Sequence, residues 1–332
     1  DYITTQRPLV VVTAPGPGSG KMAVCMSQLY HEHKRGIDAG YAKFETFPVW
    51  NLPLKHPVNL AYEAATVDLK DVNMIDPYHL EAYGTISVNY NRDVETFPVL
   101  NAIFEKIGGS PYRSPTDMGV NMVGFCISDN DAVVEAANAE IIRRYYTVLC
   151  ARRKGKWDES VMRKAELLME QAGLKGEDRP TVGEALDKED ITGMPAMAIQ
   201  LKDGRIVRGK TSDLLGPSAS ALLNAAKALS GIPKKQLLIH PSVIEPIQEL
   251  KINTLGNKNP RLHSDETLLA LAISAATDPD ARAAMEALKD LKVCEAHSTV
   301  IVPQVDEDVY RKLGINLTCE PRYDTNNRLF HK

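Results

Sequence analysis

A glycine-rich loop close to the beginning of the chain constrains its fold more than any other stretch. The β-branched residues 10–12 come first, then three glycines between positions 16 and 20, and then Lys21. From Met22 to Leu29 the apolar residues recur at the spacing of one helix face. This order predicts a strand, a loop and a helix, which is the arrangement of a phosphate-binding loop.

Each part of such a loop contributes to anion binding. Glycines let the backbone adopt positive φ and approach a ligand, the loop N–H groups point inward, and the helix begins with the positive end of its dipole. Lys21 would supply a mobile cation for the β- and γ-phosphate oxygens. The residues that we expect to bind ATP are Thr13, Gly16, Gly18, Ser19, Gly20, Lys21 and Met22.

The loop matches the pattern G-x-x-x-x-G-K-[ST] only in part. Gly20 and Lys21 fit, but Pro15 replaces the first glycine. Met22 replaces the hydroxyl residue that would bind Mg²⁺. The sequence therefore favours ATP binding over hydrolysis and leaves the role of Mg²⁺ open. The structural alternative is a loop that only links a strand to a helix.

Two further cations are candidates for orienting a substrate and stabilising charge in the transition state. Lys43 lies in the alternating stretch 40–50, which predicts a second strand. A lysine at the carboxyl end of a parallel strand would face the ligand crevice, and simple solvent exposure is the equal alternative. Arg92 belongs to the polar stretch 89–93, in which Asp93 can cap the following helix.

Two aspartates are candidates for supporting Mg²⁺. Asp117 lies in a glycine-containing loop before the apolar run 122–127, which predicts a buried strand, and Asp129 follows that run. Asp129 also stands where a helical pattern begins, so capping is its favoured role. Asp117 is therefore the better candidate for a ligand contact. The four predicted catalytic residues are Lys21, Lys43, Arg92 and Asp117.

The length of the chain and the change in sequence pattern along it predict three parts. At 332 residues the chain is long enough for two domains with sizeable cores. We expect an α/β domain with a P-loop and a mostly parallel sheet over 1–150, and a helical connector over 151–190. A smaller α/β domain with an antiparallel hairpin is expected over 191–332.

Local patterns in the second half predict individual elements. A helix is expected from Glu159 to Ala172, stopped by Gly173. Residues 196–210, with Asp-Gly at their centre, predict a hairpin with a type I′ turn. The apolar run 299–302 predicts a further strand.

The smaller domain has a candidate polar site of its own. Its histidines and carboxylates allow a metal-binding interpretation, but no H-E-x-x-H or other fixed spacing supports one, and the carboxylates also suit a helix start. We therefore predict no metal. The residues of this candidate site are Lys210, Thr211, Ser212, Asp213, His240, Asn259, Arg261, His263, Asp265 and Glu266.

Charge and cysteine usage argue against several kinds of partner. A net charge of -4 gives no electrostatic support for binding nucleic acid or an anionic membrane surface. The five cysteines form no C-x-x-C pair, so neither a disulfide framework nor a zinc knuckle is indicated. Without a disulfide framework, a reducing cytoplasm is the expected compartment, and no apolar run is long enough to cross a membrane.

Several stretches of the chain resemble a bacterial family of unknown function, uncharacterised protein family 0371. They include VTAPGPGSGKM at 12–22, NYNRD at 89–93 and GKTSDLLGPS at 209–218, and the resemblance extends over essentially all 332 residues. It implies a P-loop domain followed by a smaller α/β domain, and self-association into a homo-oligomer. It also implies an additional N-terminal segment that would complete the first domain.

The first half is also similar to dethiobiotin synthetase. That enzyme has a Gly-Lys-Thr loop and a strand ending Gly-Tyr-Phe-Lys-Pro-Val, whose lysine faces the substrate. Residues 40–45, Gly-Tyr-Ala-Lys-Phe-Glu, are similar to this strand. The similarity implies that Lys43 faces a small substrate.

Three functions are compatible with these features. The first is an ATP-dependent, ligase- or synthetase-like enzyme that activates or phosphorylates a small carboxylate-type substrate. The second is a homo-oligomeric assembly that binds ATP as a regulator and does not turn it over. The third is a nucleotide-modulated hydrolase, peptidase-like, with its chemistry in the second domain, which would need His240, His263 and Glu266 to converge.

Overall fold

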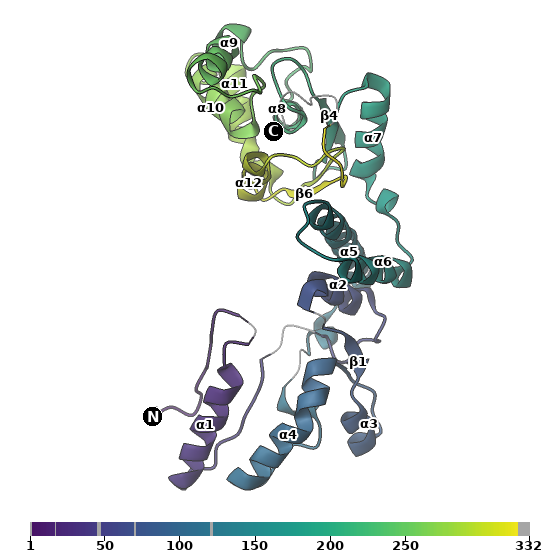
Figure 1. The fold of residues 1–332 in the computed structure, drawn as a ribbon, viewed down its shortest axis with the longest axis vertical. Helices are drawn as coiled ribbons and strands as arrows, with labels where there is room; N and C mark the ends of the chain where they lie inside the picture. The colour runs from purple at the N-terminus through teal and green to yellow at the C-terminus, as the bar shows by residue number, and fades with distance from the viewer. Residues whose placement is uncertain (1, 17, 45–47, 70, 120–121, 325–332) are drawn as a thin grey trace. The chain divides into compact units, whose positions relative to one another are not determined.

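The computed structural model describes residues 2–16, 18–44, 48–69, 71–119 and 122–324. Contacts within the chain divide it into two compact units, residues 1–138 and 139–332, here called unit 1 and unit 2 (Figure 1). The 24-residue helix α5 (Asn130–Arg153) contributes to both units. The protein is a mixed α/β protein in which helices predominate.

Unit 1 is built on a pair of helices and one small sheet. Strands β1 (Asn73–Ile75) and β2 (Val88–Tyr90) form an antiparallel pair. The other elements are α1 (Lys21–Lys34), α2 (Pro57–Ala65), η1 (Val67–Leu69), α3 (Pro77–Tyr83), α4 (Asn91–Ile107), η2 (Pro115–Met118) and η3 (Val123–Cys126).

Helices α1 and α4 run side by side in the same direction (Figure 1). Leu29 of α1 and Phe97 and Phe104 of α4 belong to one buried apolar cluster, against which Met22 also packs. The last turn of α1 lies beside the end of α4, since a Cβ atom built on Gly108 would be 2.9 Å from His33 Nδ1. The N-terminal ends of the two helices therefore share one end of the pair.

Three predicted strands of unit 1 are not strands. Residues 10–12 are irregular backbone with Val11 73% exposed, and 40–44 are irregular too, while 45–47 lie outside the described residues. Instead of a buried strand, 123–126 form a short 3-10 helix with an exposed Phe125. An apolar run becomes a strand only beside a neighbour that completes its ladder. In the described part of unit 1 the sheet consists of β1 and β2, with a single bridge residue at Val49, so no parallel P-loop sheet is found there.

Unit 2 has a four-stranded sheet in the order β4-β3-β5-β6. Its strands are β3 (Ala196–Gln200), β4 (Ile206–Lys210), β5 (Glu295–Ser298) and β6 (Asn316–Cys319). Strand β3 is antiparallel to both β4 and β5, whereas β6 is parallel to β5. Strands β4, β5 and β6 therefore all point in the same direction.

Helices make up most of the rest of unit 2. They are α6 (Glu159–Ala172), η4 (Gly176–Asp178), α7 (Pro180–Thr192), α8 (Pro217–Leu229), α9 (Pro241–Glu249), the π-helix η5 (Leu250–Thr254), α10 (Ser264–Ser274), α11 (Pro279–Ala287), η6 (Leu288–Leu291) and α12 (Gln304–Lys312). Met197 and Ile199 of β3 pack with Leu222 of α8 in one buried cluster. Helices α7 and α8 lie on opposite sides of β4 (Figure 1).

The predicted helix and hairpin of the second half are confirmed, and two finer predictions are wrong. Helix α6 has the predicted bounds, and Gly173 ends it with φ 68°. The hairpin forms, but Leu201 N–H bonds to Arg205 O and only Gly204 in its loop has positive φ. A type I′ turn needs two such residues, so that turn type was wrong. The strand expected at 299–302 is wrong as well, because β5 ends at Ser298.

A buried arginine connects α7 to this sheet. Arg179, whose side chain is 4% exposed, lies just before α7 and forms an ion pair with Glu295 of β5. Its Nη2 donates to Ala296 O at 2.9 Å and to Asn316 O at 2.7 Å, so one guanidinium bonds to both parallel strands.

We expect Arg179→Ala to lower the free energy of unfolding of unit 2 by about 3 kcal/mol, because it leaves two strand carbonyls and a carboxylate without their buried donor. Urea unfolding followed by circular dichroism measures the change. Arg163→Ala, at a side chain 78% exposed, is the matched control and should change stability by less than about 0.5 kcal/mol. A loss below about 1 kcal/mol for Arg179→Ala would contradict this role.

Candidate functional site

The glycine-rich loop closes around the ammonium group of Lys21. Lys21 is the first residue of α1, and its Nζ donates to Gly16 O at 2.8 Å and to Ser19 Oγ at 3.2 Å. Gly18 and Gly20 have φ of 70° and 85°, the left-handed region that favours glycine. No side chain caps the N-terminus of α1, and its first turn contains no acidic residue. The loop thus combines a cation with the positive end of a 14-residue helix.

Met22 has a structural role beside this loop. Its side chain packs against the apolar cluster of α1 and α4, where a serine or threonine would not contribute the same contacts. The residue at the position of the usual Mg²⁺ ligand therefore fixes the beginning of α1 to α4. Thr13, also predicted to bind the nucleotide, lies in the irregular segment that leads into the loop.

Lys43 and Arg92 are brought together around Tyr90. Lys43 Nζ donates to Tyr90 Oη at 2.7 Å and to both oxygens of Asp93, and it lies 4.8 Å from the centroid of the Tyr90 ring. The Arg92 guanidinium lies 5.6 Å from the same centroid and pairs with Asp71 at 2.7 Å. We call these five residues the Tyr90 cluster.

The backbone of Lys43 is held as firmly as its side chain. Its N–H donates to Met118 O at 2.7 Å. At Gly119, with φ 130°, an added Cβ atom would be 2.2 Å from Lys43 O, so only glycine allows the two segments to approach so closely. Asp93 does not cap α4 as predicted, because its carboxylate binds Lys43 instead and Tyr90 occupies the N-cap position.

The Tyr90 cluster and the glycine-rich loop lie at the same end of the α1–α4 pair. Lys21 begins α1, and Asp93 is in the first turn of α4. At about 1.5 Å per residue, both helices run about 20 Å from these residues to their neighbouring C-terminal ends. Lys21, Lys43 and Arg92 therefore share one end of unit 1 although they are far apart in the sequence.

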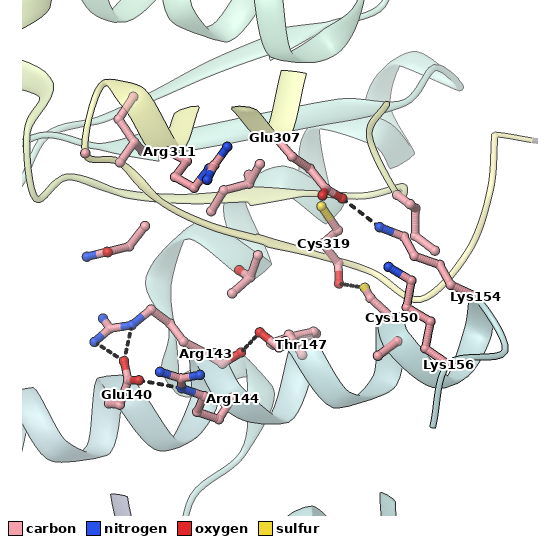
Figure 2. A pocket seen from close by; sticks show the side chains of 18 residues that line it. Glu140, Arg143, Arg144, Thr147, Cys150, Lys154, Lys156, Glu307, Arg311 and Cys319 are labelled. Carbon is pink, nitrogen blue, oxygen red and sulfur yellow. Dashed lines mark hydrogen bonds and ion pairs between the residues drawn. The ribbon is translucent and has the colours of Figure 1, made fainter. Parts of the chain in front are cut away.

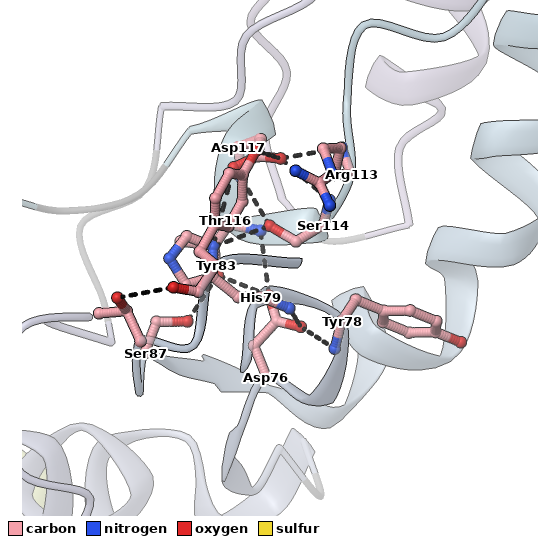
Figure 3. Close-up of polar contacts among 10 residues, drawn as sticks. Asp76, Tyr78, His79, Tyr83, Ser87, Arg113, Ser114, Thr116 and Asp117 are labelled. Carbon is pink, nitrogen blue, oxygen red and sulfur yellow. Dashed lines mark hydrogen bonds and ion pairs between the residues drawn. The ribbon is translucent and has the colours of Figure 1, made fainter. Parts of the chain in front are cut away.

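Asp117 lies in a separate polar network (Figure 3). Its Oδ2 accepts from the N–H groups of Arg113 and Ser114, at 2.8 and 3.0 Å, and from Tyr83 Oη at 2.9 Å. The bond to Asp117 raises the pKa of Tyr83. With Ser114, Asp117 forms a capping box for η2, which its S-x-x-D spacing could have indicated from the sequence. Asp129 accepts from Ala132 N–H and caps α5, the role favoured for it.

The same network contains buried groups that sequence reasoning missed (Figure 3). Asp76 is fully buried and accepts from the backbone N–H and the hydroxyl of Thr116, at 3.2 and 2.6 Å. His79 Nδ1 lies 3.0 Å from Ser114 Oγ. The ring of Trp50 stands edge-on to that of His79, with 6.0 Å between centroids. These contacts attach η2 to α3, so the network is structural support for the segment that holds Lys43.

The candidate residues of unit 2 come together in part. Arg261 Nε donates to Ser212 O at 2.7 Å, and His263 N–H donates to the Glu266 carboxylate at 2.8 Å. His240 instead caps α9 through Ser242 N–H. In the described ranges no three His, Cys, Asp or Glu side chains are arranged to hold a metal ion. Sequence reasoning missed Asp306, which is buried and lies 3.3 Å from His263 Nδ1.

A cavity of about 570 Å³ in unit 2 is lined by charged side chains of α5 and α12 (Figure 2). Arg143 and Arg144 both bond to Glu140, at 2.8 and 2.6 Å, and Lys154 pairs with Glu307 at 2.7 Å. Arg311, which also lines it, is paired with a neighbour on α12. Acidic partners thus compensate most of the cationic lining.

Comparison with known proteins establishes the family. A family model described as domain of unknown function DUF1846, N-terminal, matches residues 1–173, and the corresponding C-terminal model matches residues 177–330. The chain belongs to the DUF1846 family. The resemblance to uncharacterised protein family 0371 is thereby confirmed, whereas the similarity to dethiobiotin synthetase stays a prediction.

Streptococcal UPF0371 proteins are closely similar to the chain along its whole length. A UPF0371 protein of Streptococcus pyogenes serotype M5 (strain Manfredo) is 58% identical over 333 residues, and one of Streptococcus pneumoniae (strain JJA) is 59% identical over 333 residues. In both comparisons the match covers 100% of this chain and 67% of the relative. Among the helices described in this DUF1846 chain, none has the length and apolar character needed to cross a membrane.

The cysteines of this DUF1846 chain should differ strongly in reactivity. Burial raises the pKa of Cys150 to about 12 and raises the pKa of Cys319 further, whereas Cys126 is exposed. Since the thiolate is the nucleophile, we expect Cys126 to react first with a thiol reagent at pH 8, and Cys150 and Cys319 to react only on unfolding. Cys126→Ala should remove the fast phase. A fast phase that persists in this variant and labels Cys150 would contradict the assignment.

The pair of His263 and Asp306 should make stability depend on pH. The bond to Asp306 raises the pKa of His263, so its stabilisation is present below the ordinary histidine pKa and is lost as pH rises through the raised value. We expect His263→Gln to cost about 1 kcal/mol near pH 5.5 and progressively less above pH 7. Urea unfolding of the wild type and of His263→Gln across this pH range measures how the cost changes with pH. A cost that grows with pH would contradict it.

Proposed function

We propose that unit 1 binds ATP through the loop around Lys21. The observation that carries the proposal is the position of the ammonium group, which a backbone carbonyl and a hydroxyl hold across the loop at the N-terminus of α1. Both of these partners are neutral, so the phosphates of a nucleotide would offer Lys21 stronger, charge-assisted bonds. The positive φ values at Gly18 and Gly20 keep the loop free of side chains at these positions, which favours close approach of a phosphate.

The Tyr90 cluster supports a role in activating or phosphorylating a small carboxylate-type substrate. Its two cations lie at the same end of the helix pair as the loop, and each is oriented by a carboxylate, Lys43 by Asp93 and Arg92 by Asp71. Cations held in place before the reaction stabilise charge that develops in a transition state. Arg92, 46% exposed, can still reach a substrate anion.

Met22 favours a second candidate, an ATP-regulated homo-oligomer without turnover. Its side chain packs into the α1–α4 cluster, and it has no oxygen with which to bind Mg²⁺. A site that binds the phosphates and lacks this ligand would sense ATP. In that case nucleotide binding would change the packing of α1 against α4 and so the surface that unit 1 offers to a second copy.

Calorimetric titration of ATP, with and without Mg²⁺, tests the nucleotide site. We expect Lys21→Ala to weaken binding at least about tenfold, because it removes a charged hydrogen-bond donor worth about 1.5–3 kcal/mol. Lys106→Ala, at an exposed lysine near the end of α4, should leave the affinity unchanged. Absence of binding to the wild type, or equal affinity in Lys21→Ala, would reject the site.

Two measurements on the wild-type protein distinguish the enzyme from the ATP-regulated assembly. Release of ADP or AMP in the presence of a small carboxylic acid, abolished by Lys43→Ala, would support the enzyme. A sedimenting mass that changes with ATP while no product forms would support the assembly.

A further inference from the structure

Unit 2 contains a small cavity at the edge of the sheet where three strands end. Strands β4, β5 and β6 point in the same direction, and their carboxyl ends lead into Thr211, into 299–303 and into 320–324. The cavity of about 50 Å³ is lined by residues from each of these segments. In α/β folds the carboxyl edge of the strands is where ligands bind. The volume suffices for several water molecules or for one small charged group.

Three helices begin at this cavity. The N-cap residues of α8, α12 and α10 are Gly216, Pro303 and His263, and all three line it. The helices have 13, 9 and 11 residues, and neither α8 nor α12 has a side-chain cap. The first turns of α8 and α12 therefore favour negative charge at this place, whereas the first N–H group of α10 is already bound by the Asp306 carboxylate.

A buried hydroxyl in the cavity wall is without a partner. Ser218, in the first turn of α8, is 1% exposed, and its Oγ has no hydrogen bond to any described residue. Leaving such a group unpaired costs about 1–3 kcal/mol. An acceptor atom of a ligand at the beginning of α8 would satisfy it.

Two basic side chains complete the lining. Asp306 accepts from Ser264 N–H at 2.7 Å and faces His263 Nδ1, so Nε2 of the imidazole is a donor when His263 is protonated. Arg261 is oriented by its bond to Ser212 O. The wall also contains the carboxylates of Asp306 and Asp324, which oppose a bound anion. Ser218, Arg261 and His263 lie in two of the stretches that the sequence singled out, 209–218 and 259–266.

We propose that this cavity is an oxyanion site, which binds a phosphate or carboxylate group of a small molecule between Ser218, His263 and the first turns of α8 and α12. No residue of the site belongs to the nucleotide loop of unit 1, so the proposal stands apart from ATP binding. The proposal gives unit 2 a ligand site of its own, at the carboxyl ends of β4, β5 and β6.

Titration of the whole protein with inorganic phosphate and, separately, with acetate tests the site and distinguishes the two groups. We expect saturable binding of at least one anion in the wild type and about tenfold weaker binding in Ser218→Ala. Ser220→Ala in the same helix should bind like the wild type, and Asp324→Asn should bind more tightly. Thermal unfolding without the anion shows whether each variant is folded.

The pH dependence gives an independent readout. Affinity in the wild type should fall as pH rises through the titration of His263, and His263→Gln should flatten this profile. Absence of saturable binding of either anion would overturn the proposal. It would also be overturned by unchanged affinity in a folded Ser218→Ala variant, or by loss of anion binding in Lys21→Ala, which would place the anion in unit 1.

Discussion

Unit 2 depends on the buried positive charge of Arg179, which several acceptors share. The guanidinium of Arg179 bonds to Glu295 and to carbonyls of both β5 and β6, and Arg143 of α5 pairs with the same carboxylate. Burying an ion costs desolvation energy, which its bonds to buried acceptors offset, so such a group tolerates few alternative arrangements. The bonds of Arg179 to Ala296 O and Asn316 O hold β5 and β6 together, and the cavity beside α8 lies at the carboxyl ends of these strands.

Unit 1 differs from unit 2 because its charged groups are separate from its apolar cluster. Its Tyr90 cluster is partly exposed, and its cations are oriented by carboxylates, not buried by them. The apolar cluster between α1 and α4 supplies the rigidity, and the polar groups are attached to the ends of those helices. Because the apolar cluster holds α1 and α4 side by side, Lys21 and Arg92 lie at the same end of this helix pair although they are far apart in the sequence.

Local signals in the sequence were enough for some elements and not for others. The bounds of α6 could be predicted because Asp158 caps it and Gly173 ends it, both local effects. The runs 10–12 and 122–127 look like strands, but strand formation depends on partners that no local pattern specifies. Lys43 and Arg92 were found as separate candidates. Their joint contact with Tyr90 depends on tertiary packing and could not be predicted from the sequence.

The chain has two tryptophans, one in each unit, and Trp50 stands against the imidazole of His79 in the network that supports Lys43. Intrinsic fluorescence can therefore be separated by unit once Trp157 is replaced. Since the imidazole stands edge-on to the indole, the remaining signal would report the position of His79 relative to Trp50. This DUF1846 chain thus contains a native optical probe beside the segment that carries Lys43, without any label attached.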